Sequence, residues 1–173
     1  MRNWFSQHKR ICIKLTGFVI IPVVLISSYF IFHMETLNFT GVINNPVYGT
    51  FMKLPCLILW IYLNMLCYQE VQIPHQKHWF LITGFFAIGA LALPYTSPAA
   101  LCSNLHVFFC NIAFFLFNAM ILYSVLSDPK KLTVYFLLCC PSFLLCLFSM
   151  SVTGIAEIAY TIGITFYLTL FSQ

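Results

Sequence analysis

Residues 100–126 read ALCSNLHVFFCNIAFFLFNAMILYSVL, an apolar run that contains no Asp, Glu, Lys or Arg. A helix needs about 20 mostly apolar residues to cross the hydrocarbon core of a bilayer, and this run is long enough. Asp128 and Pro129 follow closely, and a proline is disfavoured inside a helix. The run therefore predicts one transmembrane helix that stops at Asp128-Pro129.

Similar runs occur along the whole chain and predict an all-α, polytopic membrane helix bundle with about six transmembrane helices. The approximate spans are residues 15–32, 51–68, 79–93, 100–126, 132–150 and 152–171. Pro22 is expected to kink the first of them. The runs 79–93 and 132–150 leave open a count of four or five spans with one re-entrant segment. The loops are short, the longest being 33–50, so residues 1–173 are predicted to form a single transmembrane domain.

The composition agrees with this prediction. Hydrophobic residues make up 61% of the chain and charged residues only 7%, whereas a soluble domain carries about 25% charged residues. The net charge of +4 comes from scattered basic residues and two pairs, Lys9-Arg10 and Lys130-Lys131. Both pairs lie at the ends of apolar runs, so they indicate orientation in a membrane and no nucleic-acid partner.

Orientation follows from the Lys and Arg residues, which are enriched in cytoplasmic loops. With six spans and a cytoplasmic N-terminus, seven of the eight basic residues lie on the cytoplasmic side, and only Lys53 lies outside. The seven are Arg2, Lys9, Arg10, Lys14, Lys77, Lys130 and Lys131. Both termini are therefore predicted to be cytoplasmic, in a membrane that the sequence does not identify.

Glu157 is the clearest polar residue inside a predicted span. Charges within the bilayer are costly, so an acidic residue there is a candidate functional residue. It lies about 8 Å from the outer end of the last helix, at about 1.5 Å per residue. Thr153, Thr161 and Thr165 precede and follow it at intervals of four residues, which predicts one polar stripe along the helix.

His106 lies at nearly the same predicted depth in the helix 100–126, and the first helix ends on the same side with His33 and Glu35. These positions predict an outward-facing polar cavity lined by His33, Glu35, His106 and Glu157, with Thr153 and Thr161 beside it. Three interpretations remain open: a structural hydrogen bond between His106 and Glu157, a pocket for a ligand or lipid headgroup, and a metal or acid–base site. The sequence lacks the close ligand spacing of a zinc site, so no metal and no cofactor is predicted.

Asn104, Asn111 and Asn118 recur every seven residues along the same helix. Amide side chains at this spacing favour a helix–helix seam, where they hydrogen-bond to a neighbouring helix. We therefore expect all three to face another helix and not lipid.

Three features together resemble a known family. Residues 93–98, LPYTSP, form a Pro-containing loop, and His106 to Phe117 then read H-x-x-x-C-x-x-A-x-x-x-F. The last predicted helix opens with Gly154-x-x-Glu157. The pattern, which covers mostly the third to sixth predicted helices, resembles the DRAM-like, Frag-type six-helix membrane proteins and their uncharacterised bacterial relatives. This resemblance implies a lipid-associated role, carried over to His106 and Glu157 alone.

The functional prediction is a multi-pass membrane protein that binds a lipid or other amphiphile in the outward-facing pocket. The first alternative is a structural subunit of a larger membrane complex, with other membrane proteins as partners. The second is a membrane-embedded enzyme that modifies lipid, for which the sequence names no catalytic residue. The glycine-rich loops and nucleophile motifs of common enzyme classes are absent from the sequence.

Overall fold

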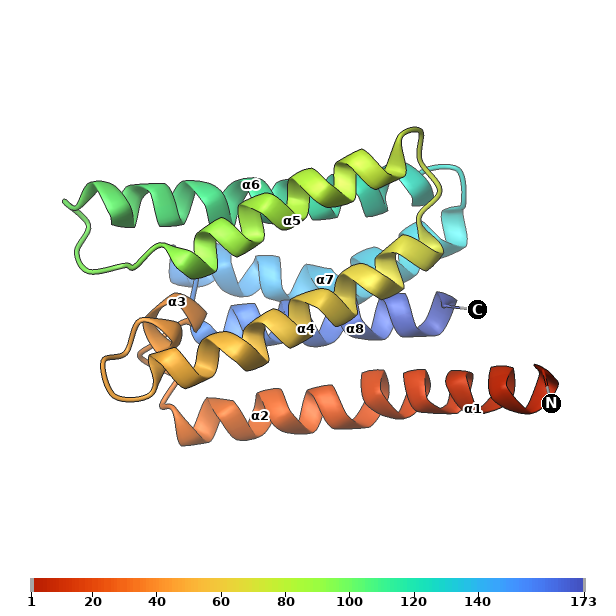
Figure 1. Cartoon of the computed structure of the whole chain (residues 1–173), viewed down its shortest axis with the longest axis horizontal. Coiled ribbons are helices and arrows are strands. Elements are labelled where there is room, and N and C mark those ends of the chain that lie inside the picture. Colours follow the sequence, from red (N-terminus) through yellow and green to blue (C-terminus); the bar gives the residue numbers. More distant parts are fainter. Residues whose placement is uncertain (1, 173) are drawn as a thin grey trace. The chain divides into compact units, whose positions relative to one another are not determined.

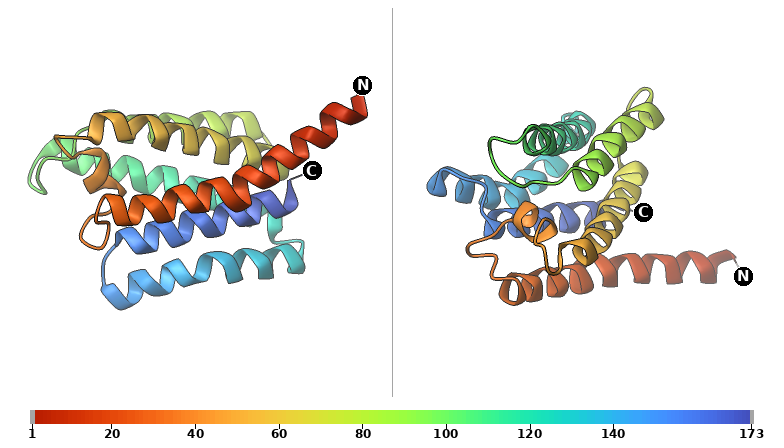
Figure 2. Two further views of the ribbon diagram at one scale, coloured as in Figure 1. Left: turned by 90° about the horizontal axis from the view of Figure 1, so that it is seen from below. Right: turned by 60° about the vertical axis from the view of Figure 1, so that its left-hand side comes forward.

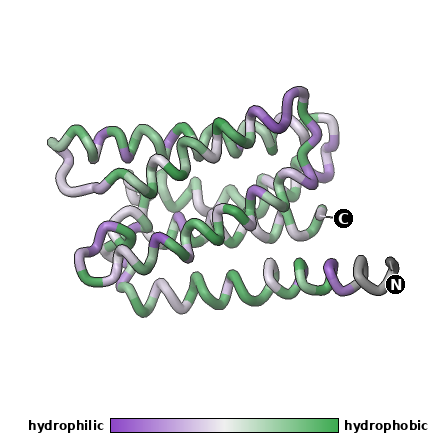
Figure 3. The backbone as a smooth tube through the Cα atoms, in the orientation of Figure 1, coloured by the Kyte–Doolittle hydropathy of each residue, from purple (hydrophilic) through white to green (hydrophobic). Residues whose placement is uncertain are grey.

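The apolar runs form long helices in the computed structural model, which describes residues 2–172 and, in its terminal helix, side chains only from residue 8 onward. All six predicted runs are confirmed as helical, and no strand occurs within residues 2–172. The elements are α1 (Arg2–Leu15), the π-helical segment η1 (Thr16–Ile20), α2 (Ile21–Ile31), α3 (Phe39–Ile43), α4 (Gly49–Glu70), α5 (Gln76–Ala92), α6 (Leu101–Val125), α7 (Pro129–Ser149) and α8 (Gly154–Phe171). Apolar residues dominate the helices and polar residues gather at the turns (Figure 3).

Five of these helical stretches are long and apolar enough to cross a membrane: His8–Ile31, Gly49–Glu70, Leu101–Val125, Pro129–Ser149 and Gly154–Phe171. The chain is therefore a multi-pass membrane protein by its helices. The predicted span 79–93 lies in α5, which has 17 residues and is about 26 Å long at about 1.5 Å per residue. That is slightly less than the roughly 30 Å of a hydrocarbon core, so a sixth span stays a prediction.

The described chain forms two compact units. Unit 1 comprises Met1–Phe39 and Thr133–Gln173, and unit 2 comprises Thr40–Leu132. The boundaries fall after the first residue of α3 and in the first turn of α7. The prediction of a single transmembrane domain over residues 1–173 stays a prediction.

In unit 1, α8 packs between α7 and the long helical stretch formed by α1, η1 and α2 (Figure 2). Close contacts depend on two glycines, because a Cβ atom at Gly17 would overlap the side chain of Thr169 and one at Gly163 would overlap the carbonyl of Leu138. Tyr135 and Tyr167 are buried and meet edge to face, with ring centroids 5.5 Å apart. Gly17 of η1 and Gly163 of α8 therefore let helix backbones approach closely, as is common in membranes.

The segment η1 explains how Pro22 is accommodated in the first span. A proline has no N–H and its ring crowds the carbonyl of the residue four positions earlier. Here the N–H of Ile21 bonds to the carbonyl of Thr16, five residues earlier, so the helix widens by one residue before Pro22. The predicted kink at Pro22 thus takes the form of a π-helical turn, one of the known ways in which a helix departs from regularity.

In unit 2, α5 runs back along α6, and α4 lies on the other side of α5 (Figure 1). Gly89 of α5 faces the ring of Phe109 so closely that a Cβ atom would overlap it. The rings of Trp60 and Phe117 lie 5.4 Å apart and join α4 to α6. Gln76 hydrogen-bonds to the carbonyls of Tyr68 and Val71 and so ties the start of α5 to the end of α4.

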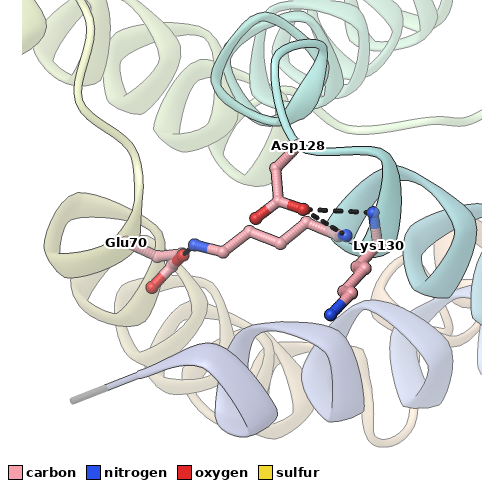
Figure 4. A network of polar contacts seen from close by, with 4 residues as sticks. Glu70, Asp128 and Lys130 are labelled. Atoms are coloured by element: carbon pink, nitrogen blue, oxygen red, sulfur yellow. Dashed lines mark hydrogen bonds and ion pairs between the residues drawn. The ribbon is translucent and has the colours of Figure 1, made fainter.

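The end of α4 also meets the start of α7 in unit 2. Lys131 forms an ion pair with Glu70, whose side chain is only 8% exposed. Asp128 accepts hydrogen bonds from the backbone N–H groups of Lys130 and Lys131 and so caps α7 (Figure 4). One member of the basic pair Lys130-Lys131 therefore neutralises a carboxylate within unit 2.

Candidate functional site

Glu157 lies in the first turn of α8, half-buried, in unit 1. Its Oε2 atom accepts a hydrogen bond of 2.5 Å from the backbone N–H of Phe39. A carboxylate near a helix N-terminus is also favoured by the helix dipole. Within unit 1, burial of Glu157 is therefore compensated by a backbone donor of the segment that follows α2.

The predicted threonine stripe is used by the helix itself. The hydroxyl of Thr161 donates to the carbonyl of Glu157 at 2.7 Å, and that of Thr165 donates to the carbonyl of Thr161 at 2.6 Å. Thr153 caps α8, because its hydroxyl accepts from the N–H of Ala156. Bonds of this kind, from a hydroxyl to the carbonyl four residues earlier, satisfy the threonines locally, so Thr161 has its donor hydrogen engaged by the backbone.

A hollow of about 350 Å³ lies in unit 1 between residues 35–38 and residues 151–154. Two predicted ligand-binding residues, Glu35 and Thr153, line it. Asn38 donates to the carbonyl of Val152 across the two segments at 3.4 Å. Gly154 permits this approach, because a Cβ atom there would overlap the carbonyls of Met34 and Leu37. The two segments follow α2 and α7, so the hollow sits where helices end.

His33 and Glu35 lie at the end of α2, as the sequence predicted for the end of the first span. His33 has a positive φ of 50°, and the N–H of Met34 returns to the carbonyl of Tyr29, which is the hydrogen bond of a Schellman motif. The Nδ1 atom of His33 is 3.3 Å from Oε1 of Glu35. The side chain of His33 is 78% exposed and that of Glu35 is 51% exposed. His33 thus ends the helix through its backbone, while its ring makes an exposed contact of little energetic weight.

His106 is completely buried in unit 2. Its Nδ1 atom lies 3.0 Å from the carbonyl of Leu93, which can only accept, so Nδ1 carries a hydrogen. Its Nε2 atom lies 3.2 Å from the hydroxyl of Thr40 and 3.6 Å from the thiol of Cys110. Both ring nitrogens are therefore engaged within unit 2, and His106 joins α6 to α3 and to the loop that follows α5.

The same loop is held by two more polar residues. The hydroxyl of Ser103, fully buried, accepts from the N–H groups of Thr96 and Ser97 at 3.0 and 3.2 Å. Asn44 accepts from the N–H of Tyr95 at 2.9 Å. The LPYTSP loop thus owes its conformation to side chains of α6 and of the segment after α3, which satisfy backbone groups that would otherwise lack partners.

Of the asparagine stripe, Asn118 is buried, and its amide donates to the carbonyl of Phe114 at 2.8 Å. Asn104 and Asn111 are at exposed positions of α6. The predicted seam stays a prediction for all three residues, because this bond of Asn118 lies within α6 and neighbours of Asn104 and Asn111 would have to come from outside unit 2.

Several of these hydrogen-bond and ion-pair partners were not predicted from the sequence. The backbone N–H of Phe39 carries no side-chain signal at all, and Thr40, Asn44 and Ser103 are ordinary loop or helix residues in the sequence. The partner of Glu70 was missed as well, since nothing in the sequence relates it to Lys131 across an intervening 60 residues.

The predicted contact between His106 and Glu157 stays a prediction, because His106 belongs to unit 2 and Glu157 to unit 1. Within the described residues, no three His, Cys, Asp or Glu side chains lie close enough together to hold a metal ion. The arrangement thus provides two separately satisfied polar centres and one hollow with a polar lining. No family model matches the sequence, and no curated protein and no solved structure is significantly similar to it.

Proposed function

We propose that this multi-pass membrane protein binds the polar headgroup of a lipid or other amphiphile at the hollow of unit 1. The observation that carries the proposal is the lining of that hollow, which includes Glu35 and Thr153. It lies where predicted spans end, at the level where lipid headgroups meet water. The resemblance of Gly154-x-x-Glu157 to the DRAM-like and Frag-type proteins agrees with a lipid-associated role.

The chemistry of the lining indicates the class of headgroup. Glu35 is an acceptor, more than half exposed, and it favours a headgroup that carries an ammonium or hydroxyl group. Glu157 does not line the hollow, but its bond to the N–H of Phe39 fixes the residue that follows Asn38 in the chain. We therefore assign Glu35 and Thr153 to the headgroup and Glu157 to the positioning of the segment 35–38.

Lipid retention tests this proposal. The protein is placed in nanodiscs of phosphatidylcholine and phosphatidylethanolamine, and the retained lipids are identified by native mass spectrometry. We expect enrichment of the amine-bearing lipid, and its loss in Glu35→Gln. Asp128→Asn serves as the control, because it removes a charge outside the hollow and keeps a side-chain oxygen that can cap α7. Equal enrichment in Glu35→Gln and the unmodified protein would contradict the proposal.

A second candidate function is that of a subunit in a membrane complex, and Asn104 and Asn111 favour it. No hydrogen bond of either side chain occurs among the described residues, and both are exposed on α6. An amide that faces hydrocarbon without a partner costs several kcal/mol, so we propose a partner helix that carries an amide or hydroxyl. Asn111→Leu should then dissociate the complex in mild detergent, while an unchanged mass by light scattering would rule this candidate out.

A further inference from the structure

A groove of about 530 Å³ separates α4 from α5 in unit 2. Trp60 and Met65 line it from α4, and Phe80 and Ile88 line it from α5, with Gly84 between the last two. Its walls are mostly apolar, and α4 is one of the helices that are long and apolar enough to cross a membrane. The groove therefore favours an apolar group over water.

Gly84 is the feature that opens the groove. Glycine is an unfavourable residue in a helix interior, so its presence calls for a reason. At Gly17, Gly49, Gly89, Gly154 and Gly163 an added Cβ atom would overlap neighbouring atoms. At Gly84 an added Cβ atom would meet nothing within 4 Å, and no glycine in the described residues has a positive φ. No contact within the described chain requires glycine at position 84. The absence of a side chain at Gly84 leaves space in the groove.

The length of the groove matches one leaflet of a bilayer. Along α4 it extends from Leu57 to Gln69, a rise of about 18 Å at about 1.5 Å per residue. Half of a hydrocarbon core is roughly 15 Å thick. Tyr68 and Gln69 place polar groups at the end of the groove near the end of α4, which is where the headgroup of a lipid would lie.

We propose that this groove holds one acyl chain of a membrane lipid. A partner helix is less suitable, because bulky Phe80 and Ile88 flank Gly84 at four-residue spacing, whereas close helix seams repeat small residues at that spacing. An acyl chain is thin and flexible enough to pass between these side chains and reach Gly84. This groove lies in unit 2 and shares no residue with the headgroup hollow of unit 1, so the inference does not rest on the proposed function.

Trp60 makes the groove measurable, because its fluorescence is quenched when a bromine atom touches its ring. Trp4 and Trp79 are replaced by Phe, and the protein is reconstituted in vesicles of phosphatidylcholine with dibrominated acyl chains. We expect strong quenching of Trp60. Gly84→Leu fills the groove with a side chain and should remove most of the quenching, and Gly84→Ala should remove less. Ala119→Leu is the matched control, since it enlarges an exposed residue of α6 outside the groove.

Two outcomes would overturn the proposal. The first is equal quenching of Trp60 in the proteins with and without Gly84→Leu. The second is weak quenching of Trp60 in the protein that keeps Gly84, which would mean that a protein segment fills the groove. Circular dichroism and thermal unfolding verify that each variant folds. Should Gly84→Leu not fold, Ile61→Phe narrows the groove from α4 and must lower the quenching in its place. Glu35→Gln should leave the quenching unchanged, which separates this test from that of the headgroup hollow.

Discussion

The backbone N–H of Phe39 donates a hydrogen bond to the carboxylate of Glu157, and this bond joins residues that are far apart in the sequence of unit 1. Glu157 belongs to the first turn of α8, and Phe39 is the first residue of α3. The carboxylate thus fixes where the chain goes after the end of α2. An acidic residue that the sequence marks as a candidate for chemistry has, in this geometry, a defined structural partner.

Replacement of Glu157 tests the weight of this bond. Glu157→Gln keeps a carbonyl oxygen that can accept from Phe39, so we expect a change of less than about 1 kcal/mol in the free energy of unfolding. Glu157→Leu leaves the N–H of Phe39 without its acceptor and should lower that free energy by about 1–3 kcal/mol. Reversible unfolding of the purified protein in mixed micelles measures both. Equal stability of the Gln and Leu variants would show that the bond contributes nothing.

The same pair of variants separates structure from function. If Glu157 acts only by positioning residues 35–38, Glu157→Gln should retain the headgroup enrichment seen in nanodiscs. Loss of that enrichment in a folded Glu157→Gln protein would show that the charge itself takes part in binding.

The second prediction concerns Thr40 and His106 in unit 2. The hydroxyl of Thr40 lies 3.2 Å from Nε2 of His106, and the His106 ring is completely buried. Thr40→Val and His106→Phe should each lower the free energy of unfolding, and the double variant should lose less than the sum. A double-mutant cycle should give a coupling of about 0.5–1.5 kcal/mol. Thr36→Val is the control, because the hydroxyl of Thr36 donates to the carbonyl of His33, in unit 1 and away from His106 in the chain. A coupling of zero would mean that the contact has no net weight.

The helices were predictable from the sequence, because a membrane helix requires a long apolar run and little else. The first predicted run, 15–32, covers the last residue of α1, η1 and α2, and the other five became α4–α8 with ends shifted by at most three residues. Pro22 correctly predicted an irregularity in the first span. The short helix α3 was not predicted, since Phe39–Ile43 has no period of its own and follows from the contacts of Phe39 and Thr40.

The polar contacts were harder to predict for a physical reason. Glu157 and His106 could be singled out because burial of a polar group in an apolar segment is costly. Their partners could not, because one is a backbone N–H and the other a common threonine, and neither leaves a pattern in the sequence. The pair Glu70 and Lys131 depends on how two helix ends meet, which only the fold decides.

The ion pair of Glu70 and Lys131 leads to the third prediction. The side chain of Glu70 is 8% exposed and that of Lys131 is 31% exposed, so removal of Lys131 leaves a carboxylate that is largely shielded from water. Lys131→Met should lower the free energy of unfolding by about 1–3 kcal/mol. Combining it with Glu70→Gln should recover most of that loss. Lys130→Met is the matched control, since Lys130 is exposed, and a surface change of this kind stays within about 0.5 kcal/mol.

The double variant Lys131→Met with Glu70→Gln decides whether Lys131→Met destabilises the protein by loss of packing or by leaving the carboxylate of Glu70 unpaired. If Lys131→Met destabilises only by loss of packing from its long aliphatic stem, Glu70→Gln will not recover it. Recovery is expected only if the unpaired carboxylate is the cause.

The last prediction concerns topology and decides whether α5 crosses the membrane. With six spans and both termini cytoplasmic, the loop at Val47 and the loop at Thr96 face outward, while Lys77 and Gln173 face the cytoplasm; Gln173 lies outside the described residues. Single cysteines at these four positions, in a protein whose eight native cysteines are replaced, are exposed to a membrane-impermeant maleimide on intact cells. On intact cells we expect labelling at positions 47 and 96 only. Positions 77 and 173 should be labelled after permeabilisation, which is the control for reactivity.

Labelling of 77 and 96 from the same side would contradict a spanning α5, since its two ends would then share one face of the membrane. Labelling of 173 on intact cells would contradict the seven-to-one distribution of Lys and Arg as the determinant of orientation.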